Sequence, residues 1–207
     1  MTANFERYQR IAPYYDLLDL PFERRRYRPI RPLLFAGLSG HILDAGVGTG
    51  RNFPFYPAGA TVLGIDLSPA MLARASGRRH LASAPVALRQ MDVTSLDLPD
   101  AAFDAAVATF LFCVLSDDLQ VPALREFARV VRPGGTIRLL EYVRPRGTVR
   151  RLLTRIWEPW IAWAYGASFE RDTESRLGAA GLEPLGSRFV YDELIKLIEA
   201  RVPALAA

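Results

Sequence analysis

The chain has little of what stabilises secreted or metal-binding proteins. Cys113 is the one cysteine in 207 residues, which excludes an internal disulfide, and no C-x-x-C pair offers metal ligands. No apolar run approaches the roughly 20 residues that cross a bilayer. The first ten residues, MTANFERYQR, carry charges in place of the apolar segment of a secretory signal. We therefore expect no metal and a cytoplasmic location.

Lysine is nearly missing as well, because Lys196 is the one lysine among 26 basic residues, and the formal net charge is +4. Half of the residues are hydrophobic, which excludes a disordered chain. The length suits one α/β domain with a substantial core. We predict a single domain over 1–207, made of a helical segment at 1–36, a core at 37–143, an insert at 144–171 and a C-terminal part at 172–207.

Apolar runs bounded by turn residues alternate with segments of helical spacing. This alternation predicts a parallel sheet with helices on both faces. The prolines at 13, 21, 29 and 32 predict two or three short helices in the first 36 residues. The expected strands are 41–46, 60–68, 86–93, 103–112, 135–143, 183–192 and 193–201, and the expected helices are 51–57, 68–79, 117–135 and 173–183.

The stretch ILDAGVGTGR places Gly46, Gly48 and Gly50 directly after a strand. Such a turn lets the backbone approach a nucleotide-like ligand at the strand's carboxyl end. The spacing is G-x-G-x-G, and Arg51 stands where the dinucleotide fingerprint has its third glycine. Asp44 would repel a pyrophosphate and attract a cation. The motif therefore predicts a nucleoside ligand that carries positive charge and no phosphate.

S-adenosylmethionine (SAM) has these properties, with S-adenosylhomocysteine as its demethylated product. Asp44 is placed to hold the ammonium group directly or through water. Asp66, 20 residues after Gly46, is placed to accept hydrogen bonds from both ribose hydroxyls. Asp92 and the backbone N–H of Val93 are placed to read the adenine. The expected cofactor-binding residues are Tyr8, Tyr14, Asp44, Gly46, Gly48, Asp66, Leu67, Met71, Asp92, Val93 and Phe110.

Individual members of this set have other interpretations. Asp66 precedes Ser68 and Pro69, where an acid commonly caps a helix, and Met71 on a helix is commonly a core residue. A nicotinamide-dependent oxidoreductase would also use an acid at position 66. The ordered set of acids and glycines at three successive strand ends favours SAM.

The segment from Asp44 to Glu141, including RVVRPGGTIRLLE, resembles the class I SAM-dependent methyltransferases. The resemblance implies a Rossmann-like sheet of seven strands in the order 3-2-1-4-5-7-6 with the last strand antiparallel. The YYD element within APYYDLLDLPFERRRYR is similar to the ubiquinone/menaquinone C-methyltransferases and the bacterial phosphatidylethanolamine N-methyltransferases. In these families the N-terminal helices form a lid over the cofactor, and tyrosines matching Tyr8 and Tyr15 contact it. We expect Tyr15 and Glu141 to be the catalytic residues.

Two arginine clusters flank the core, one at 24–31 and one at 144–155, and the second precedes three tryptophans. Arginine beside tryptophan and leucine is typical of a surface in the headgroup layer of an anionic membrane. We therefore expect peripheral association with the inner face of the membrane. Alternatively, the tryptophans pack a helix onto the sheet. We expect no nucleic-acid partner, since no N-P-P-Y-like element follows the fourth predicted strand, where TFLFCVLSD stands instead.

The NFERY start and the late basic-aromatic insert resemble the Rhodobacter-type phosphatidylethanolamine N-methyltransferases. The resemblance implies a phospholipid substrate and phosphatidylcholine as the end product. Quinone C-methylation and a non-catalytic SAM-binding module at the membrane are the alternatives. The substrate phosphate needs cationic or hydroxyl partners, and the positions expected to supply them are Tyr27, Arg31, Tyr165 and Arg171.

Overall fold

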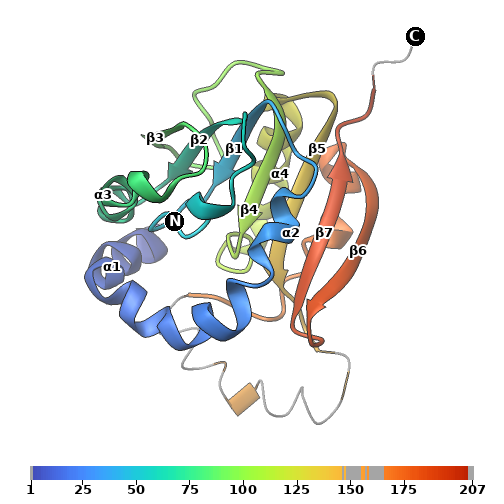
Figure 1. The fold of residues 1–207 in the computed structure, drawn as a ribbon. Helices are drawn as coiled ribbons and strands as arrows, with labels where there is room; N and C mark the ends of the chain where they lie inside the picture. The colour runs from blue at the N-terminus through green and yellow to red at the C-terminus, as the bar shows by residue number, and fades with distance from the viewer. Residues whose placement is uncertain (1, 146, 148–154, 157, 159–165, 205–207) are drawn as a thin grey trace.

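The computed structural model describes residues 2–145, 147, 155–156, 158 and 166–204. Seven strands form one sheet in the order β3-β2-β1-β4-β5-β7-β6 (Figure 1). Neighbouring strands are parallel from β3 to β5, and β7 runs antiparallel to both β5 and β6. This strand order and the antiparallel last strand confirm the predicted fold. The strands are β1 His41–Ala45, β2 Thr61–Asp66, β3 Val86–Gln90, β4 Phe103–Thr109, β5 Val131–Tyr142, β6 Glu183–Tyr191 and β7 Ile195–Arg201.

Helices cover both faces of the sheet, and each face has its own core. Side chains alternate between the two faces of a strand. On one face, Val107 of β4 packs in a cluster with Leu34 and Ala75, which belong to α2 and α3. On the other, Ala106 packs in a cluster with Phe127 of α4. The α-helices are α1 Thr2–Phe22, α2 Arg31–Phe35, α3 Pro69–Gly77 and α4 Asp117–Val130, joined by the π-helix η1 Glu23–Tyr27 and the 3₁₀ turns η2 Phe53–Phe55, η3 Arg79–Leu81, η4 Glu174–Arg176 and η5 Gly178–Ala180.

The N-terminal region differs from the prediction of helices broken at each proline. Helix α1 runs through Pro13 and Pro21 without interruption, and the turn before α2 contains Pro29. Pro13 and Pro21 are exposed, whereas Ala12 and Asp19 on the opposite side of α1 are buried. Tertiary contacts on the buried side therefore outweigh the local preference of proline to end a helix.

Other boundaries differ as well. The segment 173–183 forms the short turns η4 and η5 in place of an α-helix, and the left-handed Gly181, with φ 79°, ends it. Strand β3 ends at Gln90, so the predicted strand residues Asp92 and Val93 lie in the following loop. Most of the predicted insert at 144–171, including its three tryptophans, lies outside the described residues.

Candidate active site

A cavity of about 360 Å³ opens at the carboxyl ends of β1, β2 and β4, beneath the N-terminal half of α1. Parallel strands end at the same edge of a sheet, which brings residues from distant segments together there. The lining includes eleven residues that we predicted from the sequence. They are Tyr8, Tyr15, Gly46, Gly48, Asp66, Leu67, Met71, Asp92, Val93, Phe110 and Arg171.

The glycine-rich turn forms the floor of the cavity. Gly46 and Gly48 have φ values of 70° and 55°, which side chains rarely tolerate. A Cβ atom on Gly46 would lie 3.1 Å from Leu111 Cδ1, so a side chain there would also press on the adjoining loop. The turn thus exposes its backbone to the cavity, as the G-x-G spacing predicted.

Asp66, at the end of β2, fastens the glycine turn to the start of α3. Its Oδ2 accepts a hydrogen bond from Gly48 N at 2.9 Å, and its Oδ1 accepts one from Ser68 N at 2.8 Å. Burial raises the pKa of Asp66, and these donors oppose that shift. Ser68 Oγ accepts a hydrogen bond from Met71 N and so caps α3. Asp66 itself lines the cavity.

The loop after β4 forms the opposite wall, and it holds Phe110 in a left-handed backbone conformation with φ 54°. Its ring lies between Tyr27, at 4.8 Å between ring centroids, and Tyr142, at 5.0 Å. Non-glycine residues in this conformation are strained, and such strain is concentrated at ligand sites. The two neighbouring rings therefore hold the strained backbone of Phe110 in place and fix this wall of the cavity.

Glu141, which we expected to be catalytic, does not line the cavity. It is 1% exposed, and its carboxylate accepts hydrogen bonds from the backbone N–H groups of Leu111, Phe112 and Cys113 at 2.9–3.1 Å. Burial raises the pKa of Glu141 to about 7, against the effect of these three donors. In this arrangement Glu141 positions the loop that carries Phe110, and a direct catalytic role stays a prediction.

Asp44 is also fully buried, beneath the glycine turn. Tyr56 Oη donates to its Oδ2 at 2.7 Å, and Asn52 Nδ2 donates to the same atom at 3.0 Å. Burial raises the pKa of Asp44 to about 6, and both donors oppose the shift. Its side chain braces the residues behind the turn and is not part of the cavity lining, so direct contact with an ammonium group stays a prediction.

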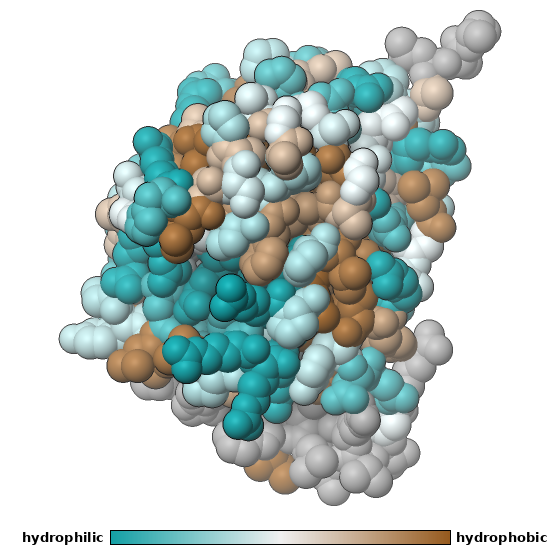
Figure 2. All heavy atoms as spheres, in the orientation of Figure 1, coloured by the Kyte–Doolittle hydropathy of each residue, from teal (hydrophilic) through white to brown (hydrophobic). Residues whose placement is uncertain are grey.

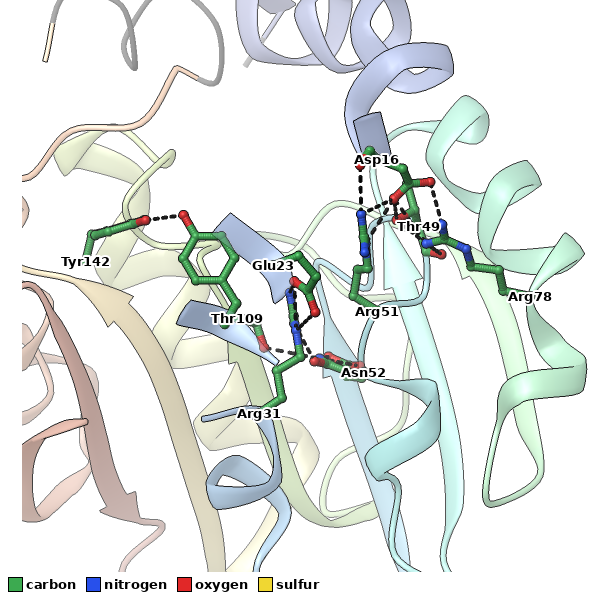
Figure 3. A network of polar contacts seen from close by, with 11 residues as sticks. Asp16, Glu23, Arg31, Thr49, Arg51, Asn52, Arg78, Thr109 and Tyr142 are labelled. Atoms are coloured by element: carbon green, nitrogen blue, oxygen red, sulfur yellow. Dashed lines mark hydrogen bonds and ion pairs between the residues drawn. The ribbon is translucent and has the colours of Figure 1, made fainter. Parts of the chain in front are cut away.

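Several other predicted residues are not among those that line the cavity. Tyr14 is 66% exposed on the outer side of α1. Arg31 is 5% exposed and pairs with Glu23 at 2.8 Å, and its other end donates to Asn52 Oδ1 at 2.7 Å (Figure 3). The hydroxyl of Tyr27 is hydrogen-bonded to that of Tyr142. The structure thus gives Arg31 and Tyr27 protein partners, and Tyr165 lies outside the described residues.

Comparison with known proteins agrees with this geometry. Residues 43–139 match the model of the family described as "Methyltransferase domain". The phosphatidylethanolamine N-methyltransferase of Cereibacter sphaeroides is 39% identical over 161 residues, which are 73% of this chain and 78% of that protein. The ubiquinone/menaquinone biosynthesis C-methyltransferase of Syntrophotalea carbinolica is 40% identical over 67% of this chain and 60% of its own length.

The chain belongs to the SAM-dependent methyltransferases. A crystal structure of an S-adenosylmethionine-dependent methyltransferase from Mesorhizobium loti shares the fold, with a TM-score of 0.62, 21% identity and coverage of 84% of this chain and 96% of that one. These findings confirm SAM as the methyl donor.

The residues of the cavity fit this methyl donor. Asp66 and Asp92 supply carboxylates and the glycine turn supplies open backbone, whereas Arg51, beside that turn, is directed at Asp16. Asp92 Oδ1 also accepts from Thr94 N at 2.9 Å, which fixes its orientation. A site with this donor set suits a phosphate-free nucleoside with a cationic sulfur. When bound, SAM would supply the methyl group, and these residues would hold its sugar and base.

One functional group that sequence reasoning missed is Asp16, the acid of the YYD element. Its carboxylate is the centre of a set of contacts that we name the α1 latch (Figure 3). Burial raises the pKa of Asp16, but the positive charges and hydrogen bonds of the latch hold it below the ordinary value. The latch joins Asp16 to Thr49 Oγ1 at 2.8 Å, Arg51 Nη2 at 3.0 Å, Arg74 Nη2 at 2.9 Å and Arg78 Nη2 at 2.8 Å.

The α1 latch fixes the helix that covers the cavity. A second tie lies two turns earlier, where Gln9 Oε1 accepts from Ser68 Oγ and Ala70 N, each at 3.0 Å. The helix is therefore bound to both the glycine turn and α3. This placement of α1 agrees with the lid that the resemblance implied.

Replacement of Asp16 by Ala is expected to loosen α1. It leaves three arginines without their shared counter-charge, so the free energy of unfolding should fall by about 2 kcal/mol. This is less than the roughly 3–5 kcal/mol of a fully buried pair, because the arginines keep partial access to water. Urea denaturation measures the loss, and limited trypsin digestion should cut α1 faster. Asp97→Ala is the control, since that side chain is 96% exposed; equal digestion of both variants would contradict the latch.

Among the described residues, no group of three or more His, Cys, Asp or Glu side chains could hold a metal ion. In the same part of the chain, no helix has both the length and the apolar character needed to span a bilayer.

Proposed function

We propose that this enzyme methylates the amino group of phosphatidylethanolamine, by direct in-line transfer from SAM, towards phosphatidylcholine. The observation that carries the proposal is the position of Arg171. This cation lines the same cavity as Asp66 and Gly46, and its Nε is buried without a hydrogen-bond partner among the described residues. Arg171 Nη1 donates to Asp117 at 2.6 Å, which holds the guanidinium in place. A buried guanidinium N–H with nothing to donate to is a suitable partner for a phosphodiester.

The rest of the cavity wall supports a lipid-like acceptor. Leu111, Val114, Leu115 and Leu119 line the cavity together with Arg171 and the expected cofactor residues. Apolar side chains next to a cation complement a phosphate head with adjoining hydrocarbon. They also exclude water, and methyl transfer from a sulfonium requires a site free of water. The similarity to the enzyme of Cereibacter sphaeroides adds to this support.

We further propose that α1 rests on an anionic membrane surface through its outer side. Tyr14, Leu17 and Leu18 are 66%, 70% and 42% exposed there. Exposed arginines stand at both ends of this stripe, at positions 10, 24, 25 and 28. Figure 2 shows hydrophobic surface beside hydrophilic surface over the region where α1 lies. Each arginine near an anionic bilayer contributes about 1 kcal/mol of binding.

Labelled SAM offered with defined vesicles tests the function. With vesicles of phosphatidylethanolamine and phosphatidylglycerol, we expect label in monomethyl and dimethyl ethanolamine lipids. Activity should fall as salt rises, since salt screens the arginines, and it should fall when phosphatidylcholine replaces the anionic lipid. Arg171→Met should raise KM for the lipid while leaving S-adenosylhomocysteine affinity within about threefold.

The outcomes separate the candidates. Label found only in a demethylated quinone added to the vesicles would establish the C-methyltransferase alternative, which the relative from Syntrophotalea carbinolica suggests. Tight cofactor binding with no labelled lipid in a whole-cell extract would indicate that the protein is a SAM-binding module without catalytic activity. Vesicle activity that is independent of salt and lipid charge would reject the outer side of α1 as the membrane contact.

A further inference from the structure

Three carboxylates lie on the inward side of α1 and η1, and two of them have protein partners. Asp16 is held by the α1 latch, and Glu23 pairs with Arg31 at 2.8 Å (Figure 3). Asp19 lies between them in the helix and is 6% exposed. Among the described residues it has no hydrogen bond and no ion pair. A buried, unpaired carboxylate costs free energy, so its retention points to a ligand.

Asp19 lies beside the cavity. It follows Tyr15, which lines the cavity, by four residues in α1, and side chains at this spacing are neighbours with Cβ atoms about 5–6 Å apart. The hydroxyls of Tyr27 and Tyr142 are hydrogen-bonded to each other. Burial is the main cause of the raised pKa of both tyrosines, and the negative charge of Asp19 adds to each shift.

Aromatic packing links Tyr27 and Tyr142 to the cavity. Tyr27 packs on Phe110 at 4.8 Å and stands edge-on to Tyr142 at 6.3 Å, and Phe110 itself lines the cavity. Rings around a carboxylate attract an organic ammonium group through their negative faces. A phosphate or a neutral quinone ring gains nothing from a negative charge at this point. The chemistry of the cluster therefore selects a cationic acceptor.

We propose that Asp19, with Tyr15, Tyr27 and Phe110 around it, binds the primary ammonium group of the acceptor and takes its proton. This inference rests on the proposed function and names a residue that would act in it. The ammonium nitrogen gives one proton to the Asp19 carboxylate and regains its lone pair. The nitrogen then forms a bond to the methyl carbon, while the sulfur keeps the electron pair of the broken S–C bond and becomes a neutral thioether. The product is a methylated ammonium, and Asp19 returns its proton to solvent.

The ionisation of Asp19 gives this step a pH dependence. Burial, and then the charge of Glu23, raise the pKa of Asp19 to about 6, and two nearby arginines oppose the shift. Only the ionised form accepts a proton, so the rate should rise with pH through about 6. The charged or titratable groups that face Asp19 are Tyr15, Asp16 and Glu23 from α1 and η1, Tyr27 from η1, Arg31 from α2, Arg51 from the glycine turn and Tyr142 from β5.

The test compares Asp19→Asn, Asp19→Glu and wild-type enzyme on vesicles of phosphatidylethanolamine and phosphatidylglycerol. We expect Asp19→Asn to lower kcat by 10²- to 10³-fold, the usual contribution of a positioned proton acceptor, and to abolish the rise of rate through pH 6. Asp19→Glu should keep part of the activity. S-adenosylhomocysteine affinity, measured by calorimetry, should stay within threefold in both variants. Asp97→Asn, which removes an equal charge from an exposed loop, should match wild type.

Each result has one meaning. If the wild-type enzyme methylates phosphatidylethanolamine and Asp19→Asn keeps the same kcat, KM and pH profile, the role of Asp19 is wrong. The proposed function then still stands. If the wild-type enzyme labels quinone alone, both the role of Asp19 and the proposed function are wrong. An unchanged melting temperature in Asp19→Asn excludes misfolding as the cause of lost activity, and loss of cofactor affinity along with kcat would make Asp19 a structural residue of the lid.

Discussion

Asp66→Ala is expected to weaken S-adenosylhomocysteine binding by about 10- to 100-fold. The carboxylate holds Gly48 N and Ser68 N, and in the proposed complex it also accepts from the ribose hydroxyls. Hydrogen bonds to a charged group contribute about 1.5–3 kcal/mol each, and every 1.4 kcal/mol is a factor of ten in affinity. The variant therefore loses both the ligand contact and the tie between the glycine turn and α3. Isothermal calorimetry with S-adenosylhomocysteine measures the change.

Asp97→Ala is the matched control for Asp66→Ala, because it removes an exposed carboxylate with one distant partner, Arg89 at 3.6 Å. Its affinity should equal that of wild type. Unaltered binding by Asp66→Ala would remove Asp66 from the cofactor site and with it the assignment of the ribose position.

Glu141→Ala should lower the free energy of unfolding by at least about 3 kcal/mol. The substitution leaves the buried N–H groups of Leu111, Phe112 and Cys113 without their acceptor, and each such group costs about 1–3 kcal/mol. The loop that carries Phe110 then loses its support, so turnover and cofactor affinity should fall together. Urea denaturation, calorimetry and the lipid assay measure the three quantities on one preparation.

Glu199 of β7 provides the comparison for Glu141. It faces its partner Arg138 at 2.8 Å but is about one-third exposed, so Glu199→Ala should cost no more than about 1 kcal/mol. A Glu141→Gln variant of normal stability that has lost turnover and kept cofactor affinity would speak for a catalytic acid instead of a positioning residue.

The alternation of strands and helices and most of the cavity lining could be predicted from the residues themselves, whereas the strand order was implied by the resemblance to the class I methyltransferases. Gly46 and Asp92 follow β1 and β3, Asp66 ends β2, and parallel strands must present their carboxyl ends at one edge. Residues in those positions are brought together by the fold itself, whatever their distance along the chain.

The predicted residues that do not line the cavity, and the residues that sequence reasoning missed, depend on side-chain pairing between distant segments. Arg31 has the charge and the N–H donors of a phosphate ligand, but Glu23 and Asn52 occupy its guanidinium group. Asp44 likewise is occupied by hydrogen bonds from Asn52 and Tyr56. Asp19 gives no local signal, because its burial follows from the docking of α1. The acid of YYD was visible, but its four partners come from two segments that only the folded chain brings near it.

The position of α1 also bears on how repeated methylation proceeds. This helix supplies Tyr8 and Tyr15 to the wall of the cofactor cavity, and in our proposal it also grips the acceptor through Asp19. In the proposed reaction, movement of α1 to release the spent donor would also release the lipid headgroup. This arrangement favours distributive methylation, in which singly and doubly methylated lipids return to the bilayer between rounds.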